Sequence, residues 1–563
     1  MEENINYEAP FTPNEAPDNN NNGAPFAAPE APVKSKKRRI VNTDEKDRVF
    51  SLLFLLLSIV GAGLTFWGRF NLGFTVTHTL FFILTSVYAA QGGKTKLTPF
   101  PIFCGLTAVA MSAMFALRID TFIDIALFAA IVCLDCVYFG NLWGTPKYAI
   151  SEVTMITDVL RRLLHPLRHT ILPLRSLPAS KEKKTLSFNW RVIIGLLLAF
   201  PLAVLLFFLL ARSDVAFENL VKNIRFDLTG IAKYVFVGLI CFPYLFAFAF
   251  TLKNKTDASV KPGKPIPRFV DGTIFNTVLS VVSALYAVYL FSQLSYFISA
   301  FSNLLPDDFS HAEYARRGFF EICIIAAINI CLVFVSLAAV KTKNGDEKPS
   351  LSSKMLCMFI CAFTLFLIST AISKMFMYID NYGMTRLRIL TSCFMVFLGV
   401  TFITAIIRIF ARNFPYMKVL ITAAAVILLG ISITDIDTYI ARYNIDAFES
   451  GKIKYAEDII YDFDNSDPGV YAEMVRLYES DKLKETQRYD LMLCMSNKIY
   501  EYYEIDTKKV NGETQFTFTE REITHDFRSF NLEKRRGEAQ VKAFVQEHKE
   551  DVVEFLKEEY WYY

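Results

Sequence analysis

Three ionisable side chains lie inside long apolar runs, where a charge is costly. Asp124 and Asp135 are eleven residues apart, a spacing that returns to almost the same face of an α-helix. A carboxylate near the middle of a bilayer costs on the order of 3 kcal/mol on insertion scales, so another interaction should offset that cost. These carboxylates therefore either line a water-filled pathway or pair with a polar group such as His78.

Two further patterns have the spacing of metal ligands, and each has a structural alternative. Cys133-Leu-Asp-Cys136 supplies only half of a typical zinc ligand set, so packed core cysteines explain it better. Asp462-Phe-Asp-Asn-Ser466 with Glu473 fits part of a calcium loop. The loop glycine is replaced by Asp467, however, and Asp467-Pro468 is typical of a helix start with Asp as the N-cap.

The common catalytic motifs are absent from the sequence. It contains no glycine-rich phosphate loop ending in Lys-Ser/Thr, no His-Glu-x-x-His and no Gly-x-Ser-x-Gly. We therefore identify no catalytic residue and expect no metal and no cofactor.

The composition indicates a membrane protein. The chain has 563 residues, of which 53% are hydrophobic and 20% charged, and a soluble protein this apolar would aggregate. Residues 1–48 differ, being rich in Pro and Asn and ending in the basic run Lys34, Lys36, Lys37, Arg38 and Arg39, and we expect them to be a disordered tail. The apolar run after the tail is too long for a cleaved signal peptide, so it should be a retained helix.

The apolar runs predict an all-α polytopic membrane domain over residues 49–433. A helix needs about 20 apolar residues to cross the hydrocarbon core. About eleven such runs occur, at about 49–67, 72–90, 101–117, 121–140, 192–211, 231–252, 273–302, 318–340, 355–376, 389–408 and 416–433.

The distribution of Lys and Arg predicts the orientation, because cytoplasmic loops retain positive charge. With the N-terminal tail inside, about 30 Lys/Arg lie in inside segments and about 11 in outside loops. With an odd number of spans, the region from residue 434 to the end should then lie outside the cytoplasm of a cell with this protein in its cell membrane.

Residues 434–563 predict a small, mainly α domain with one β-hairpin. Apolar residues recur with helical spacing at about 437–450, 454–463, 468–480, 485–505 and 531–560. Asn511-Gly512, between Lys509-Val510 and the alternating run Gln515-Phe-Thr-Phe-Thr519, is typical of a hairpin turn. By our count, 29 Asp/Glu face 18 Lys/Arg, so the domain is acidic.

The stretch Arg161-Arg162-Leu-Leu-His165-Pro-Leu-Arg168-His169 lies on the cytoplasmic side in this topology. Two histidines around a proline do not make a ligand set. An amphipathic helix that lies on the membrane surface and faces anionic headgroups explains the pattern better.

Three segments resemble a known family. His311-Ala-Glu-Tyr-Ala-Arg-Arg-Gly-Phe-Phe-Glu321, Tyr382-Gly-Met-Thr-Arg-Leu-Arg388 and Asp437-Thr-Tyr-Ile-Ala-Arg-Tyr-Asn-Ile-Asp446 are similar to signature segments of an uncharacterised bacterial multi-spanning membrane protein family, domain of unknown function 4173, related to 4153. Asp526-Phe-Arg-Ser-Phe-Asn531 resembles the late motif of that family, with Phe527 in place of Trp. The resemblance covers about residues 230–535. It implies a bacterial cell-membrane location and a fold, and it adds no chemistry.

The predicted topology gathers charged side chains from these segments at the outer membrane boundary. We expect a mixed-charge cluster that docks the C-terminal domain, with Glu321 paired to Arg386 or Arg388 as its deepest element, because opposite charges at similar depth offset the cost of poor solvation. The alternative is ordinary interfacial charges that each face water or headgroups separately. The residues of the predicted cluster are Glu313, Arg316, Arg317, Glu321, Lys374, Tyr382, Arg386, Arg388, Asp437, Arg442 and Asn444.

Function remains open between classes. The dedicated C-terminal domain and the lack of catalytic motifs favour a non-enzymatic envelope component for sensing, scaffolding or assembly, with the lipid bilayer and an envelope protein as partners and no nucleic acid. A secondary transporter is the alternative, with Asp124, Asp135, Glu321 and Lys374 as coupling or substrate groups. A membrane-embedded enzyme is a third alternative.

The orientation can be tested on Cys494, because the other nine cysteines all lie in apolar runs. In intact cells, a membrane-impermeant thiol reagent should label Cys494 if the C-terminal domain is extracytoplasmic. Labelling only after permeabilisation would place the domain in the cytoplasm and change the span count by one.

Overall fold

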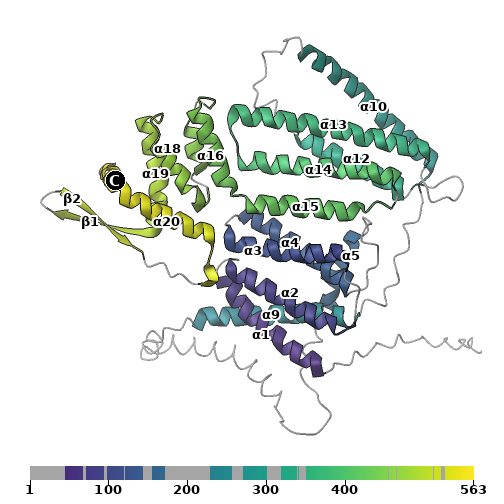
Figure 1. Cartoon of the computed structure of the whole chain (residues 1–563), viewed down its shortest axis with the longest axis horizontal. Coiled ribbons are helices and arrows are strands. Elements are labelled where there is room, and N and C mark those ends of the chain that lie inside the picture. The colour runs from purple at the N-terminus through teal and green to yellow at the C-terminus, as the bar shows by residue number, and fades with distance from the viewer. Residues whose placement is uncertain are drawn as a thin grey trace, which may run out of the picture. The chain divides into compact units, whose positions relative to one another are not determined.

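Figure 1 shows a computed structural model of the chain. The structure describes residues 45–67, 71–93, 98–118, 121–143, 155–170, 228–255, 270–300, 319–338, 340, 350–411, 413–453, 456–463, 466–510, 513–521 and 527–562. The predicted tail up to residue 44 and the predicted span at 192–211 lie outside the described residues.

The first group of membrane helices, here the first bundle, comes from the N-terminal half of the chain. It contains α1 (Glu45–Trp67), α2 (Leu72–Ala90), α3 (Pro99–Leu117), α4 (Thr121–Leu142) and α9 (Leu228–Lys253), with the short α5 (Met155–Leu164) and η1 (His165–His169) beside them. In this bundle α1 packs along α9, and α3 packs along α4. Pro99 and Pro101 lie in the first turn of α3, where a missing backbone N–H does no harm.

The second bundle contains α10 (Gly272–Ala300), α12 (Phe319–Ala338), α13 (Leu351–Tyr382) and α14 (Arg386–Phe410). The next helix, α15 (Tyr416–Ile433), packs against α14 on one side and α3 on the other, as Figure 1 shows. Among the described helices, α15 therefore joins the two bundles within the membrane.

The prediction of a polytopic α-helical membrane protein is confirmed. Within the described ranges, nine helices are long and apolar enough to cross a membrane. They correspond to nine of the eleven predicted spans. The predicted span at 318–340 is present as α12, whose apolar part, Glu321–Leu337, is shorter than the others.

One face of the first bundle is fastened by a buried cluster of charged and polar side chains. The hydroxyl of Tyr88, near the end of α2, donates to Asp47 Oδ1 at 2.7 Å, and Lys253, the last residue of α9, pairs with the same carboxylate. Asp47, in the first turn of α1, is only 2% exposed. The start of α1 and the ends of α2 and α9 therefore share one membrane face, called here the Asp47 face.

The C-terminal region continues directly from α15. Its elements are α16 (Ile436–Glu449), α17 (Glu457–Phe463), η3 (Pro468–Val470), α18 (Tyr471–Tyr478), α19 (Glu485–Tyr502), β1 (Tyr503–Val510), β2 (Glu513–Glu520), η4 (Phe527–Ser529), α20 (Leu532–Glu547) and α21 (Lys549–Tyr562). They enclose an apolar core of their own, in which Leu477, Met495 and Ile499 are almost fully buried.

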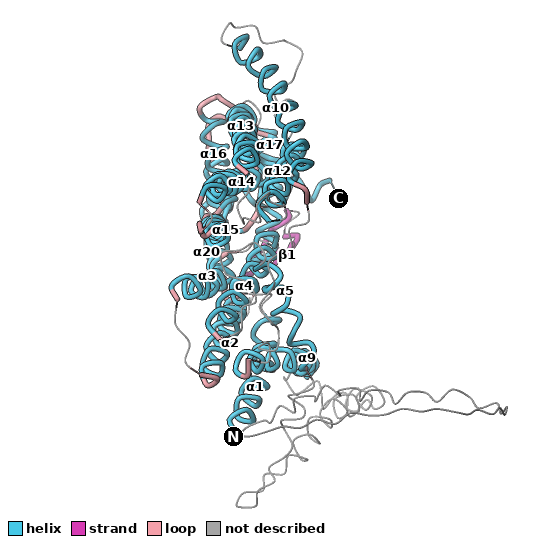
Figure 2. The backbone as a smooth tube through the Cα atoms, turned by 90° about the vertical axis from the view of Figure 1, so that its right-hand side faces the viewer, coloured by secondary structure: helices cyan, strands magenta, loops and turns pink. Residues whose placement is uncertain are grey.

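The predicted β-hairpin is confirmed, and Figure 2 shows it as strand in a mostly helical chain. β1 and β2 are antiparallel, with Ile505 opposite Phe518 and Thr507 opposite Phe516. Ile505, Phe516 and Phe518 lie on one face and pack against the apolar core. The hairpin begins earlier than expected: the helix predicted over 485–505 ends at Tyr502, because alternation of apolar and polar residues begins at Tyr503.

The helix predicted over 531–560 is two helices in the structure, separated at His548. Phe544 of α20 and Phe555 of α21 both pack into the same core. A single straight helix of this length would extend well past that core, so the break lets both segments bury their apolar faces.

Cys494 is half-buried and packs against this core, so it should react slowly in the folded protein. A sharper orientation test introduces cysteine at Tyr461, which is 75% exposed, in a Cys494→Ser background. If the C-terminal region is extracytoplasmic, an impermeant maleimide should label this variant in intact cells, and the Cys494→Ser protein alone should stay unlabelled. Labelling confined to permeabilised cells would disprove that orientation.

Candidate functional site

The candidate site is the junction where the C-terminal region meets the helix ends opposite the Asp47 face. Its centre is Arg386, the first residue of α14. The guanidinium donates from Nε to Asp437 Oδ1 at 3.1 Å and from Nη2 to Asp437 Oδ2 at 2.5 Å. A third contact, from Nη2 to Asp467 Oδ2, measures 3.2 Å. Such bidentate, charge-assisted contacts fix orientation as well as position.

Asp437 is the central acceptor of this cluster and is 9% exposed. It lies in the first turn of α16, and its Oδ2 also accepts the backbone N–H of Asp467 at 3.1 Å. One carboxylate therefore holds both the start of α14 and the start of η3.

A second contact joins Asn444 of α16 to the loop between α13 and α14. The Asn444 amide accepts the backbone N–H of Met384 at 2.6 Å and donates to the Met384 carbonyl at 2.8 Å. The neighbouring Gly383 has φ +78°, and a Cβ there would lie 2.7 Å from Asn444 Oδ1. Only glycine suits both the backbone conformation and the close approach.

Arg388 stabilises the same loop from within the second bundle. Its guanidinium donates to the carbonyls of Tyr382, at 2.9 Å, and Gly383, and it lies 3.9 Å from the centre of the Tyr378 ring. These carbonyls at the end of α13 would otherwise lack partners. Arg388 thus shapes the loop that Asn444 binds.

The segment after the hairpin fastens the C-terminal region to the first bundle. The Phe530 carbonyl accepts the N–H of Leu72, the first residue of α2, at 3.3 Å, and the Ser529 carbonyl accepts from the Asn71 side chain at 3.4 Å. Helix N-termini leave such N–H groups without partners inside the helix, so these contacts cap α2.

Asn531 caps two helices at once and is 1% exposed. Its Oδ1 accepts the N–H of Lys534 and so begins α20. Its Nδ2 donates to the carbonyls of Phe115 and Arg118 at the end of α3, at 3.2 and 2.7 Å. The backbone geometry of both helix ends therefore depends on this one amide.

Arg118 also binds the segment between α15 and α16. It pairs with Asp435 Oδ2 at 3.0 Å and donates to the Ile433 carbonyl at 3.0 Å. The other oxygen of Asp435 accepts the N–H of Thr438 and caps α16. The end of α15, the start of α16 and the end of α3 are thus joined by two side chains.

A small pocket opens at this junction. Its lining is acidic, with Asp124, Asp435, Asp467 and Glu533 facing a single basic residue, Arg118. The excess of carboxylates favours water or cationic groups over anions. No metal-ligating group of three or more His, Cys, Asp or Glu side chains occurs among the described residues.

Inside the first bundle, the structure pairs Asp135 of α4 with His78 of α2. Their Oδ2 and Nε2 atoms are 3.0 Å apart, and each residue is 7% exposed. Of the two alternatives for the buried carboxylates, Asp135 follows the pairing one. Asp124 is half-buried and belongs to the junction pocket instead.

The predicted outer-face cluster is right in part. Tyr382, Arg386, Arg388, Asp437 and Asn444 do come together at the junction, through the contacts above. The pairing of Glu321 with Arg386 or Arg388 is wrong, because Arg386 binds Asp437 and Asp467 while Arg388 binds backbone carbonyls. Glu321 is exposed at the start of α12, and Lys374 is half-buried on α13. Glu313, Arg316 and Arg317 lie outside the described residues.

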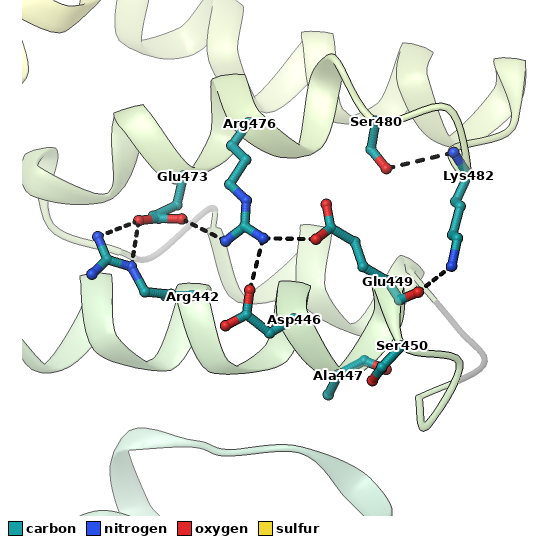
Figure 3. Close-up of polar contacts among 9 residues, drawn as sticks. All are labelled: Arg442, Asp446, Ala447, Glu449, Ser450, Glu473, Arg476, Ser480 and Lys482. Atoms are coloured by element: carbon teal, nitrogen blue, oxygen red, sulfur yellow. Dashed lines mark hydrogen bonds and ion pairs between the residues drawn. The ribbon is translucent and has the colours of Figure 1, made fainter.

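Arg442 belongs to a separate network within the C-terminal region, drawn in Figure 3. It donates to Glu473 Oε1 from Nε at 3.0 Å and from Nη2 at 2.8 Å. Arg476 binds Asp446 at 2.7 Å and Glu449 at 2.6 Å. The hydrogen bond to Asp446 is the main reason that the pKa of Arg476 is raised. This network fastens α16 to α18 and does not reach the membrane helices drawn from the described residues.

Sequence reasoning missed Arg118 and Asp467 as junction residues. Asp467 was predicted as an N-cap, and it does precede η3, but its side chain makes no capping hydrogen bond and binds Arg386 instead. Arg118 stands alone in a very short loop between two apolar runs, a position that marks an interfacial residue but gives no partner.

The Arg386–Asp437 pair can be tested by a double-mutant cycle. Arg386 is 33% exposed, so Arg386→Gln should lower the free energy of unfolding in detergent by about 2 kcal/mol, less than for a fully buried pair. Combined with Asp437→Asn, the coupling should be about 1 kcal/mol or more. Glu321→Gln and Arg442→Gln serve as controls and should each change stability by less than about 1 kcal/mol. Additive effects of Arg386→Gln and Asp437→Asn would argue against the pair.

Comparison with known proteins gives one match. No curated protein and no solved structure matches the chain. The matching family model is described as a domain of unknown function and covers residues 102–465. That span takes in α3 through α17, and so includes both bundles in part together with Arg386, Asp437 and Asn444 of the junction. The chain belongs to the family of domain of unknown function DUF4153.

Proposed function

We propose that this protein is a membrane scaffold or sensor whose C-terminal region is an extramembrane domain docked on both bundles. The observation that carries the proposal is that this region has polar contacts with each bundle. It reaches the first bundle through Phe530 and Asn531, and the second through Asp437 and Asn444.

The docking contacts are specific because they satisfy helix ends. Asn531 caps α3, Phe530 caps α2, and Asp437 neutralises the guanidinium at the start of α14. A rigid shift of the C-terminal region would leave these groups without partners near the membrane boundary, at a cost of about 1–3 kcal/mol for each buried group. Docking therefore couples the position of the region to that of both bundles.

Such coupling suits sensing or assembly. Within the membrane, α15 connects the bundles among the described helices, and its apolar stretch is only 17% buried. A partner that binds the C-terminal region would change the relative position of the bundles through the junction. A signal from the membrane would pass in the opposite direction by the same contacts.

We place the C-terminal region outside the cytoplasm of a bacterial cell, from the Lys/Arg distribution and the resemblance to family 4173. The arrangement of helix ends is compatible with the predicted alternation. The ends of α4 and α9 pack in one apolar cluster that includes Phe139 and Leu252, so these two helices run in the same direction. The predicted span at 192–211 would account for that.

The docking proposal can be tested by hydrogen exchange on the full chain in detergent. Asn531→Ala should speed amide exchange at the start of α2 and the end of α3, as well as in α20. A loss of about 1–2 kcal/mol corresponds to an increase of about 5- to 30-fold in exchange through local opening. Arg442→Gln, within the Figure 3 network, is the matched control and should leave α2 and α3 unchanged.

The functional part of the proposal needs partners. The tagged full chain, purified in mild detergent, should retain specific envelope proteins, and Asn531→Ala and Arg386→Gln should lose them while Arg442→Gln keeps them. Retention of the same partners by all four proteins would show that docking does not support the function.

A secondary transporter is the second candidate, and the His78–Asp135 pair favours it. An ionisable pair buried between membrane helices is a common place for proton coupling. In vesicles containing the protein and a trapped pH dye, an imposed pH gradient should then decay faster than in empty vesicles, and Asp135→Asn should remove the difference. Asp124→Asn, on the same helix but outside the pair, is the control. Equal decay with wild-type and empty vesicles would count against proton transport.

A further inference from the structure

The short helix α5 and the turn η1 have two clearly different faces. Met155, Asp158, Arg162 and Pro166 are buried against the first bundle. The opposite side carries a row of apolar side chains, 50–59% exposed, at Ile156, Leu160, Leu164 and Leu167. The first three are spaced four residues apart, so they form a single stripe along the helix.

The inward face is fixed by close contacts. The Arg162 guanidinium lies against Gly140 near the end of α4, where an added Cβ would come within 2.2–2.4 Å of it. The Tyr244 hydroxyl of α9 donates to the Leu163 carbonyl at 3.0 Å. The apolar stripe therefore cannot rotate toward the bundle without breaking these contacts.

The stripe lies beside the membrane boundary. Gly140 is two residues from the end of α4, and that end packs with the ends of α2 and α9, through Trp143, Ala89 and Leu252. The helix is thus at the Asp47 face, at the level where hydrocarbon gives way to headgroups.

Basic side chains accompany the stripe. Arg168 is exposed, Arg161 is half-buried and pairs with Asp158 at 3.2 Å, and the rings of His165 and His169 have centroids 4.9 Å apart. The buried Arg162 corrects the simple expectation that the whole basic run faces the membrane surface. A smaller set, centred on Arg168, remains available to a headgroup.

We propose that α5 and η1 form a binding surface for anionic phospholipid. The row from Ile156 to Leu167 enters the acyl region, and Arg168, with Arg161 and the two histidines, binds the phosphate. An apolar face with flanking Arg is the chemistry of interfacial helices, and continuity with the spanning helices α4 and α9 places a bilayer against it.

The test compares full-length protein in nanodiscs of phosphatidylcholine with and without phosphatidylglycerol. After extraction into detergent, mass spectrometry of the intact protein counts the retained lipids. Wild type should retain phosphatidylglycerol in preference to phosphatidylcholine. Arg168→Gln should reduce that preference about fivefold, the change expected for one basic residue near an anionic surface. Arg442→Gln, an exposed arginine far along the chain in the C-terminal region, should leave it unchanged.

A second variant tests the apolar stripe separately. Leu160→Ser with Leu164→Ser should lower the total retained lipid of both kinds while keeping the preference, and the exposed apolar control Tyr461→Ser should have no effect. Unchanged preference in Arg168→Gln, or an equal loss in Arg442→Gln, would overturn the proposal. Unchanged total lipid in the double leucine variant would overturn insertion of the stripe.

Discussion

The ends of membrane helices impose the constraint on which this structure depends. The first N–H groups and the last carbonyls of a helix have no partners within it, and near a bilayer they cannot all rely on water. Here the C-terminal region supplies several of the missing partners. Asn531 serves α3 and α20 together, and the Phe530 carbonyl serves α2. A polar network at helix ends, rather than a large apolar interface, determines how the C-terminal region docks.

Charged groups follow the same logic on both membrane faces. At the Asp47 face, one nearly buried carboxylate accepts from Tyr88 and Lys253 and so joins three helices. At the junction, Asp437 joins α14, α16 and η3 through Arg386 and the Asp467 N–H. In each case a single carboxylate receives donors from elements far apart in the sequence. A carboxylate with several donors is well satisfied, which makes its burial near the membrane acceptable.

Polar groups within the membrane are also paired across helices, once in each bundle. His78 and Asp135 join α2 and α4 in the first bundle. In the second, Asn329 accepts from Tyr286 and donates to Thr364, each at 2.8 Å, and so links α10, α12 and α13. Such interhelical contacts contribute about 0.6 to 2 kcal/mol each. Asn329 is fully buried, so its hydrogen bonds also fix the rotation of α12 in the bundle.

The sequence by itself determined the elements. Long apolar runs specify membrane helices because backbone polar groups must be satisfied within each segment, and Asn511-Gly512 between alternating residues specifies the hairpin. The Tyr382, Asp437 and Asp526 segments that carried the family resemblance also marked the junction, although their partners could not be read from them. Tertiary structure alone decided those partners: Arg386 could have met Glu321, Asp437 or Asp467, all suitable by charge. The choice depends on how the helix ends are placed in space, since a charge pair needs contact within a few ångströms and sequence spacing fixes distance only within one element.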